Sequence, residues 1–301
     1  LGLAFGVAVG IAFGCMPGLS VNMGLALLFP LAFSFQGIGG ILMLLGIYCG
    51  AIYGGSISAI LLKTPGTPAS VATTLDGYPM ATKLKQPGRA LGLSTMASMF
   101  GGVFSTICLI LLAPQLAKFA LQFSKPEYFA LAIFGLSIIT SVSSGSVVKG
   151  IMGGLFGLFL ATVGIDDMSG TVRFTMDTTY FLGGVSFIPV LIGVFAFAQV
   201  LTSIEDYHQS PQSEPIKFLD KVLPSWADIK KVFVTLVRSS TIGTFIGCVP
   251  GTGGDIASFV SYDQAKRWSK NSANFGNGEP EGVAAPEAGN NAVSGGAFIP
   301  V

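Results

Sequence analysis

Charged residues are scarce in this sequence. They make up 10% of its 301 residues, whereas hydrophobic residues make up 51%. Because a soluble domain has about 25% charged residues, this composition predicts a polytopic membrane protein lying in a lipid bilayer. The formal net charge is only +1, without the basic excess that binds nucleic acid, so we expect no nucleic-acid partner.

Cysteine and histidine are also rare. The four cysteines stand singly within apolar runs and form no CxxC pair, which argues against a disulfide framework or a cysteine-bound metal. The one histidine, His208, lies in a polar stretch where we expect it to be solvated. Because no acyl-transfer constellation is present either, we expect a protein that is not an enzyme.

What the sequence does contain is one motif that occurs twice. Gly-Cys-x-Pro-Gly stands at 14–18 and again at 247–251, and apolar runs flank both copies. Proline removes a backbone donor and glycine permits a positive φ, so we expect one helix to end and another to begin at each copy. Broken helices at membrane depth are tolerated where the freed backbone lines a cavity. Two of them in corresponding places are typical of a transporter's substrate site.

The duplicated motif predicts an all-α, polytopic membrane protein with two inverted repeats, each with Pro-Gly-broken helices or re-entrant hairpins. We place the first repeat at 1–204, a polar linker at 205–231, and the start of an incomplete second repeat at 232–301. Basic residues follow the second break but not the first, and this asymmetry favours inversion. Basic residues are also in excess in the segment Asp76–Arg89, so we interpret it as a polar loop on the cytoplasmic side of the membrane. Since no initiating methionine is present, we expect an internal portion of a longer protein.

A weaker sequence similarity extends the repeat beyond the two breaks. Ala292, Gly295 and Gly296 match Ala51, Gly54 and Gly55, in the same order after the two breaks.

The two Pro-Gly breaks are the predicted substrate site. Helix N-termini carry partial positive charge and free N–H groups, so they can bind a carboxylate without a charged side chain. A kink that only shapes packing is the alternative, and duplication of the motif favours the functional interpretation. The residues expected to bind substrate are Pro17, Gly18, Ser20 and Asn22 at the first break, and Pro250, Gly251, Thr252 and Gly253 at the second.

Gly254 and Asp255 follow the second break directly. Their oxygen atoms suit a hard cation, so they form a possible sodium site. Asp255 could instead cap the helix that follows, or do both.

A third break, from Lys63 through Thr64, Pro65 and Gly66 to Thr67, holds the only charge in the first 75 residues. A cation in an apolar run usually faces a cavity, so we expect all five residues to contribute to substrate binding. Lys63 would pair with the substrate carboxylate and keep sodium away from this half. Snorkelling of Lys63 to a membrane interface is the alternative.

Asn290 and Asn291 lie among small residues, close to Glu287. Buried amides in a membrane need partners, so the two asparagines either line the substrate pocket or hold helices together. We include both among the candidate substrate-binding residues.

Three segments together resemble the large membrane subunit of the tripartite tricarboxylate transporters: Gly50–Lys83, the two GCxPG stretches, and PEAGNNAVSGG at Pro286–Gly296. The resemblance covers essentially the whole chain. It implies uptake of an organic di- or tricarboxylate by a multi-pass protein of the bacterial inner membrane, with elevator-type movement. It also implies a periplasmic substrate-binding protein and a small four-helix membrane subunit as partners. Sodium or protons would serve as the coupling ion.

Two other functions are compatible with these features. A channel or passive facilitator would share the broken helices without needing two conformations. An intramembrane hydrolase would use Asp255 and Asp263, although the usual Tyr-Asp pair upstream of Gly-x-Gly-Asp is absent. The segment GTGGD is neither a Walker A loop nor a dinucleotide fingerprint, because the lysine and the final glycine of those motifs are missing.

Overall fold

The computed structural model of the chain describes residues 1–120, 146–185 and 220–299, except 17, 18, 20, 36, 167, 168 and 250–252, together with residues 126, 130, 189, 190, 193 and 201. The first part contains α1 (Gly2–Cys15), α2 (Val21–Ala32), α3 (Gly39–Leu62), η1 (Pro68–Ser70), α4 (Val71–Thr82) and α5 (Pro87–Ala120). It is followed by α7 (Val147–Ala161), the strands β1 (Gly164–Ile165) and β2 (Val172–Arg173), and η2 (Thr179–Phe181). The last part contains α10 (Trp226–Gly247), α11 (Gly254–Trp268), η4 (Ser272–Asn274) and α12 (Pro280–Gly296).

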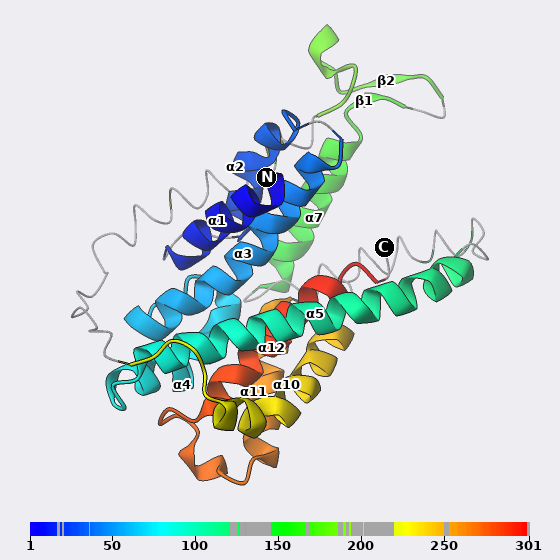
Figure 1. Cartoon of the computed structure of the whole chain (residues 1–301). Coiled ribbons are helices and arrows are strands. Elements are labelled where there is room, and N and C mark those ends of the chain that lie inside the picture. The colour runs from blue at the N-terminus through cyan, green and yellow to red at the C-terminus, as the bar shows by residue number, and fades with distance from the viewer. Residues whose placement is uncertain are drawn as a thin grey trace.

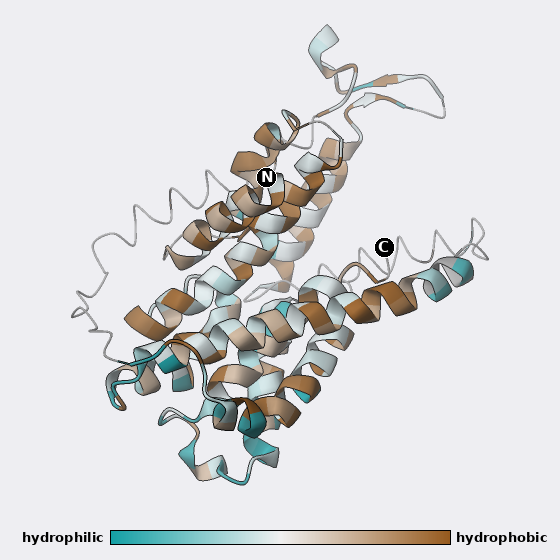
Figure 2. Cartoon of the chain, in the orientation of Figure 1, coloured by the Kyte–Doolittle hydropathy of each residue, from teal (hydrophilic) through white to brown (hydrophobic). Residues whose placement is uncertain are grey.

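The described chain is mostly helical and apolar. The helical stretches Gly39–Leu62 and Pro87–Gln115 are long and apolar enough to cross a membrane, and α1, α2 and α7 are shorter apolar helices. Figure 2 shows hydrophobic residues along α1, α2, α3 and the middle of α5, whereas hydrophilic residues gather at the α4–α5 and α11–α12 connections. The prediction of an all-α membrane protein is thus supported, while the inversion of the repeats stays a prediction.

Helix α1 packs on α3 through glycine. A Cβ at Gly10 would meet the backbone oxygen of Ile47, and one at Gly14 would meet that of Ala51. The same contact recurs between α10 and α12, where a Cβ at Gly243 would meet the backbone oxygen of Gly289. Small residues let helix backbones approach closely, which drives association in a lipid environment. The repeat found in the sequence is therefore also a repeat of helix packing.

The main core lies where α12 passes between α5, α10 and α4 (Figure 1). Nearly every residue of α12 is buried. The apolar residues that surround it come from four other elements: Ile60, Met80, Ala81, Ala90, Leu93, Ala97, Val232 and Leu236. The polar side chains of α12 consequently lie deep in the protein rather than at its surface.

One sequence interpretation needs correction. The segment Asp76–Arg89 is not a loop, because α4 continues to Thr82 and α5 begins at Pro87. Asp76 is fully buried and accepts hydrogen bonds from the backbone N–H groups of Gly276, Gly278 and Glu279. These partners lie some two hundred residues along the chain, so a local charge pattern could not reveal them.

The predicted linker at 205–231 is described from Asp220 onward, and α10 already begins within it at Trp226. Ser225 caps α10 and forms a reciprocal capping box with Asp228. The division of the chain into repeats and linker stays a prediction.

Candidate functional site

Each predicted break separates two helices. Helix α1 ends at Cys15 and α2 begins at Val21, while α10 ends at Gly247 and α11 begins at Gly254. The third break lies between the end of α3 at Leu62 and the start of η1 at Pro68. Six of the predicted site residues fall outside the described part of the chain: Pro17, Gly18, Ser20, Pro250, Gly251 and Thr252.

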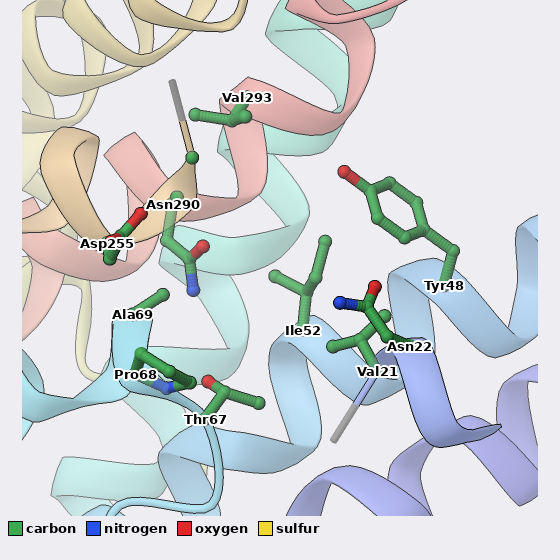
Figure 3. A pocket seen from close by; sticks show the side chains of 12 residues that line it. Val21, Asn22, Tyr48, Ile52, Thr67, Pro68, Ala69, Asp255, Asn290 and Val293 are labelled. Atoms are coloured by element: carbon green, nitrogen blue, oxygen red, sulfur yellow. The ribbon is translucent and has the colours of Figure 1, made fainter. Parts of the chain in front are cut away.

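A cavity of about 350 Å³ brings all three breaks together. Asn22 reaches it from the first break, Thr67 from the third, and Gly253, Gly254 and Asp255 from the second. Asn290 of α12 lines it as well (Figure 3). The structure also adds lining residues that motif reasoning did not single out: Val21, Tyr48, Ile52, Pro68, Ala69 and Val293. Their apolar or aromatic character carries no signal in a sequence that is mostly apolar.

Asn290 is the most informative residue of the cavity. The residue is 2% exposed, and its Nδ2 has no hydrogen-bond partner in the described structure. Figure 3 shows its amide pointing into the space bounded by Ile52, Pro68 and Ala69. An unpaired buried amide costs about 1–3 kcal/mol, so this donor is poised to bind an acceptor from a ligand.

The N-terminus of α11 lies against this amide. A Cβ at Gly254 would clash with Oδ1 of Asn290, so glycine is required for this close approach. The first N–H groups of a helix have no intrahelical partner and carry partial positive charge. Together with Asn290 they provide hydrogen-bond donors suited to a carboxylate.

Asp255 lies in the first turn of α11, but Gly253 is the N-cap residue and no side chain caps this helix. Capping therefore does not explain Asp255. Its side chain is exposed and lines the cavity, so its oxygens face the space where a cation or a substrate would bind. In the part of the chain that is described, no cluster of three His, Cys, Asp or Glu residues could hold a metal.

At the third break, Thr67 lines the cavity, whereas Gly66 packs against the end of α1. Thr67 lines the cavity and caps η1 together with Ser70. Gly66 is buried and donates its N–H to the backbone oxygen of Gly55, and a Cβ there would clash with the backbone oxygen of Gly14. Gly66 thus holds the third break against the end of α1.

Lys63, Thr64 and Pro65 do not line the cavity. Lys63 is exposed in a left-handed conformation with φ 59°, and its Nζ lies 5.7 Å from the centre of the Tyr78 ring. Thr64 has a buried hydroxyl without a partner among the described residues. The predicted contact between Lys63 and substrate is therefore not part of this cavity.

Asn291 lines a different cavity from Asn290. It lines a second cavity of about 500 Å³ formed by α1, α3, α5 and α12. Its Nδ2 donates to Ser98 Oγ at 3.0 Å and to the backbone oxygen of Glu287 at 2.9 Å. Of the two predicted roles for the asparagines, Asn290 therefore lines the candidate site and Asn291 joins α12 to α5.

Comparison with known proteins places the chain in a family. A family model described as the tripartite tricarboxylate transporter TctA family matches residues 1–301. The chain belongs to the TctA family. This membership confirms the resemblance carried by the motifs at Gly50–Lys83 and Pro286–Gly296 and supports a transporter component in the membrane.

Two similar proteins come from Agrobacterium vitis. One is described as an uncharacterized 52.8 kDa protein in the TAR-I ttuC′ 3′ region, and it is 38% identical over 296 residues, which are 98% of this chain. The other, described as an uncharacterized protein in the TAR-II ttuC′ 3′ region, is 51% identical over 59 residues, or 20% of this chain and 24% of its own length. The chain spans 58% of the length of the first relative. No solved structure matches the chain.

Proposed function

We propose that the chain forms the substrate-carrying part of a secondary transporter that takes up an organic di- or tricarboxylate. The observation that carries this proposal is the unpaired, buried amide of Asn290 beside the N-terminus of α11, in a cavity that joins three helix breaks. A volume of about 350 Å³ lies at the small end of ligand sites, which suits a small organic acid. Membership of a tricarboxylate transporter family supports the same substrate class.

The transporter works with two partners in this proposal. A periplasmic binding protein delivers the carboxylate, and a small four-helix subunit accompanies the chain as a multi-pass protein in the bacterial inner membrane. The family's description as tripartite supports the presence of partner subunits. An ion gradient of sodium or protons drives accumulation, the two repeats being inverted and moving as an elevator. Gly254 and Asp255 are the proposed ligands if sodium binds beside the substrate.

The structure gives no support to the intramembrane hydrolase. Asp255 and Asp263 lie on the same helix, where eight residues separate them by about 12 Å along the axis. Two carboxylates that share a proton or a water must lie in contact, as in aspartic proteases. Asp263 also pairs with Arg267 of its own helix at 2.8 Å.

The test uses the complete protein with its partner subunits in liposomes and citrate and succinate as probes. We expect counterflow and gradient-driven accumulation of at least one probe, because a passive channel gives neither. Asn290→Ala should lower the affinity about tenfold or more, since it removes a buried donor. Asn271→Ala, which removes an exposed amide outside the cavity, is the matched control and should leave transport unchanged. Unchanged affinity in Asn290→Ala would show that this cavity is not the substrate site.

A further inference from the structure

Glu287 is a fully buried carboxyl group on α12 that the proposed substrate site does not use. Its side chain is 0% exposed. Among the described residues, the groups that donate hydrogen bonds to it are hydroxyl groups, with Thr73 Oγ1 at 2.5 Å from Oε1 and Ser98 Oγ at 3.0 Å from Oε2. Within the described ranges no lysine or arginine forms an ion pair with it. A buried carboxylate without a cation is costly, and taking up a proton is the usual way to remove that cost.

The charged and titratable groups on the elements packed around Glu287 interact with residues other than Glu287. On α4, Asp76 is bonded to backbone N–H groups and to the hydroxyl of Tyr262 from α11. On α10, the Arg238 guanidinium lies 4.4 Å from the centre of the Trp268 ring. The stretch of α5 from Ala90 to Gly102 contains no titratable side chain.

The remaining groups on α3, α11 and α12 can be placed in the same way. Tyr53 of α3 bonds to Thr95. Glu279, the N-cap residue of α12, pairs with Lys231, and Glu281 of α12 bonds to Thr235. Tyr48 and Asp255 line the first cavity, and Cys49 lines the second. The two cations of α11, Lys266 and Arg267, are exposed, and Arg267 pairs with Asp263. In the described part of the chain none of these groups forms an ion pair with Glu287, so a proton is the means at hand to neutralise its charge.

Glu287 lies close in sequence to residues that line both cavities, the candidate substrate cavity and the second cavity. On a helix, residues three and four positions apart lie on the same face. Asn290 is three residues after Glu287 and lines the candidate substrate cavity, while Asn291 is four residues after it and lines the second cavity. Glu287 therefore lies one helical turn from both.

A hydrogen-bonded path leads from the second cavity to the carboxyl group. Asn291 Nδ2 donates to Ser98 Oγ, and Ser98 Oγ donates to Oε2 of Glu287. Both Ser98 and Asn291 line the cavity, each being 7% exposed. A hydroxyl can accept a proton from water on one side and donate one on the other, so Ser98 can relay a proton.

We propose that Glu287 is the proton-carrying group of this transporter, loaded from the second cavity through Ser98. This inference rests on the proposed function. A proton from water adds to Oε2 and turns the carboxylate into a neutral carboxyl group, and the reverse step returns the proton to water without other bond changes. Because a substrate carboxylate one turn away repels a second negative charge, substrate binding favours the protonated form. By linkage, a bound proton favours substrate to the same degree.

The test again uses the complete protein with its partner subunits in liposomes, with citrate as the probe. Glu287→Gln keeps the shape of the protonated side chain but cannot release a proton. We expect it to lose pH-gradient-driven accumulation about tenfold or more while citrate counterflow at equal pH persists. Asp263→Asn is the matched control, since it neutralises an exposed carboxylate on α11, and it should keep both activities.

A second variant and a binding measurement guard against misfolding of Glu287→Gln. Ser98→Ala removes the relay and keeps the carboxyl group, so proton-driven accumulation should slow while counterflow continues. Calorimetry of citrate binding to wild-type protein, in buffers of different ionisation enthalpy, should show net proton uptake that Asp263→Asn retains. Absence of proton uptake in the wild type would overturn the proposal.

The outcomes separate this proposal from the proposed function. Transport by the wild type that is independent of the pH gradient overturns the role of Glu287 alone. Loss of sodium dependence rather than proton dependence in Glu287→Gln would make the residue a sodium ligand, and the proposal would be wrong. If the wild type moves neither citrate nor succinate, the proposed function fails and this inference fails with it.

Discussion

Helix α1 packs on α3 in the same way as α10 packs on α12, but the two pairs carry different side chains at corresponding positions. In both, a helix that ends at a Gly-Cys-x-Pro-Gly break lies against a later helix through glycine, with Gly10 on Ile47 and Gly243 on Gly289. This contact aligns Tyr48 with Asn290 and Cys49 with Asn291, which is one residue away from the register that the sequence match of Ala51 with Ala292 predicts. Both members of the first pair line the candidate substrate cavity, and both members of the second pair line the other cavity.

The chemistry of the two copies differs at these aligned positions. The first copy has tyrosine and cysteine, and it has the apolar Leu45 at the position that corresponds to Glu287. The second copy has two amides and a carboxyl group in a helix that is buried along most of its length. Glycine contacts therefore determine how closely the helix backbones approach in both copies. The side chains at a few aligned positions give the second copy alone the amides and the carboxyl group that the proposals use. The predictions below test this difference, beginning with the largest expected effect.

Replacing the contact glycines tests whether the two copies share one packing scheme. Gly10→Val and Gly243→Val should each lower stability by about 3 kcal/mol or more, because the new side chain meets backbone that cannot move aside. Thermal unfolding of purified protein in detergent measures the loss. Gly157→Val in α7, where a Cβ meets nothing within 4 Å, is the control and should unfold like the wild type. A normal melting temperature for Gly243→Val would contradict the shared contact.

The second copy is anchored at the N-terminus of α10. There α10 has the Ser225–Asp228 capping box and an ion pair between Asp228 and Arg89 at 2.5 Å. Asp228→Asn should lower stability by about 1–2 kcal/mol, because it weakens charge-assisted hydrogen bonds to Arg89. Ser272→Ala, in the connection after α11, should have little effect.

The same anchor gives a pH dependence. Burial raises the pKa of Asp228, but hydrogen bonds from Arg89 and Ser225 outweigh it and hold the pKa below its usual range. A carboxyl with a lowered folded pKa contributes stability above its unfolded pKa near about 4, and loses it as the pH falls through the folded value. The melting temperature of the wild type should therefore fall more steeply below that pH than that of Asp228→Asn. Parallel curves would show that this pair contributes little.

Asn22 and Asp255 occupy corresponding positions after the two breaks, and both line the substrate cavity. Asp255→Asn should strengthen citrate binding about threefold, because it removes a like charge from an exposed position near the substrate. Asn22→Asp should weaken binding by a similar factor. Isothermal titration with and without sodium measures both. If Asp255→Asn instead weakens binding and removes sodium dependence, Asp255 is the sodium ligand of the second break.

Lys63 belongs to the third break, and the structure places its side chain outside the cavity. We therefore expect the smallest effect from Lys63→Asn, a change of affinity within about twofold. Asparagine also tolerates the left-handed conformation at this position, so the fold should be kept. The same titration against sodium concentration measures the effect. A tenfold loss of affinity would show that Lys63 reaches the substrate, as the charge pattern alone predicts.

Local sequence features predicted much of the fold. The helix breaks, the apolar helices and the duplicated motif depend on proline, glycine and hydropathy, whose effects act within a few residues. Three candidate residues at the breaks, Asn22, Thr67 and Gly253, lie together with Gly254, Asp255 and Asn290 around one cavity. Asp76 was misplaced in a loop because its partners are backbone N–H groups beyond Phe275.

The sequence by itself determined that the chain is a helical membrane protein with a repeated break, and its motifs identified the family. The tertiary structure alone decided that Asn290 and Asn291 face different cavities, that Lys63 lies outside the substrate cavity, and that Glu287 is bonded to Thr73 and Ser98. The reason is physical: helix breaks follow from local backbone sterics, whereas burial and hydrogen-bond partners depend on which distant helices come into contact.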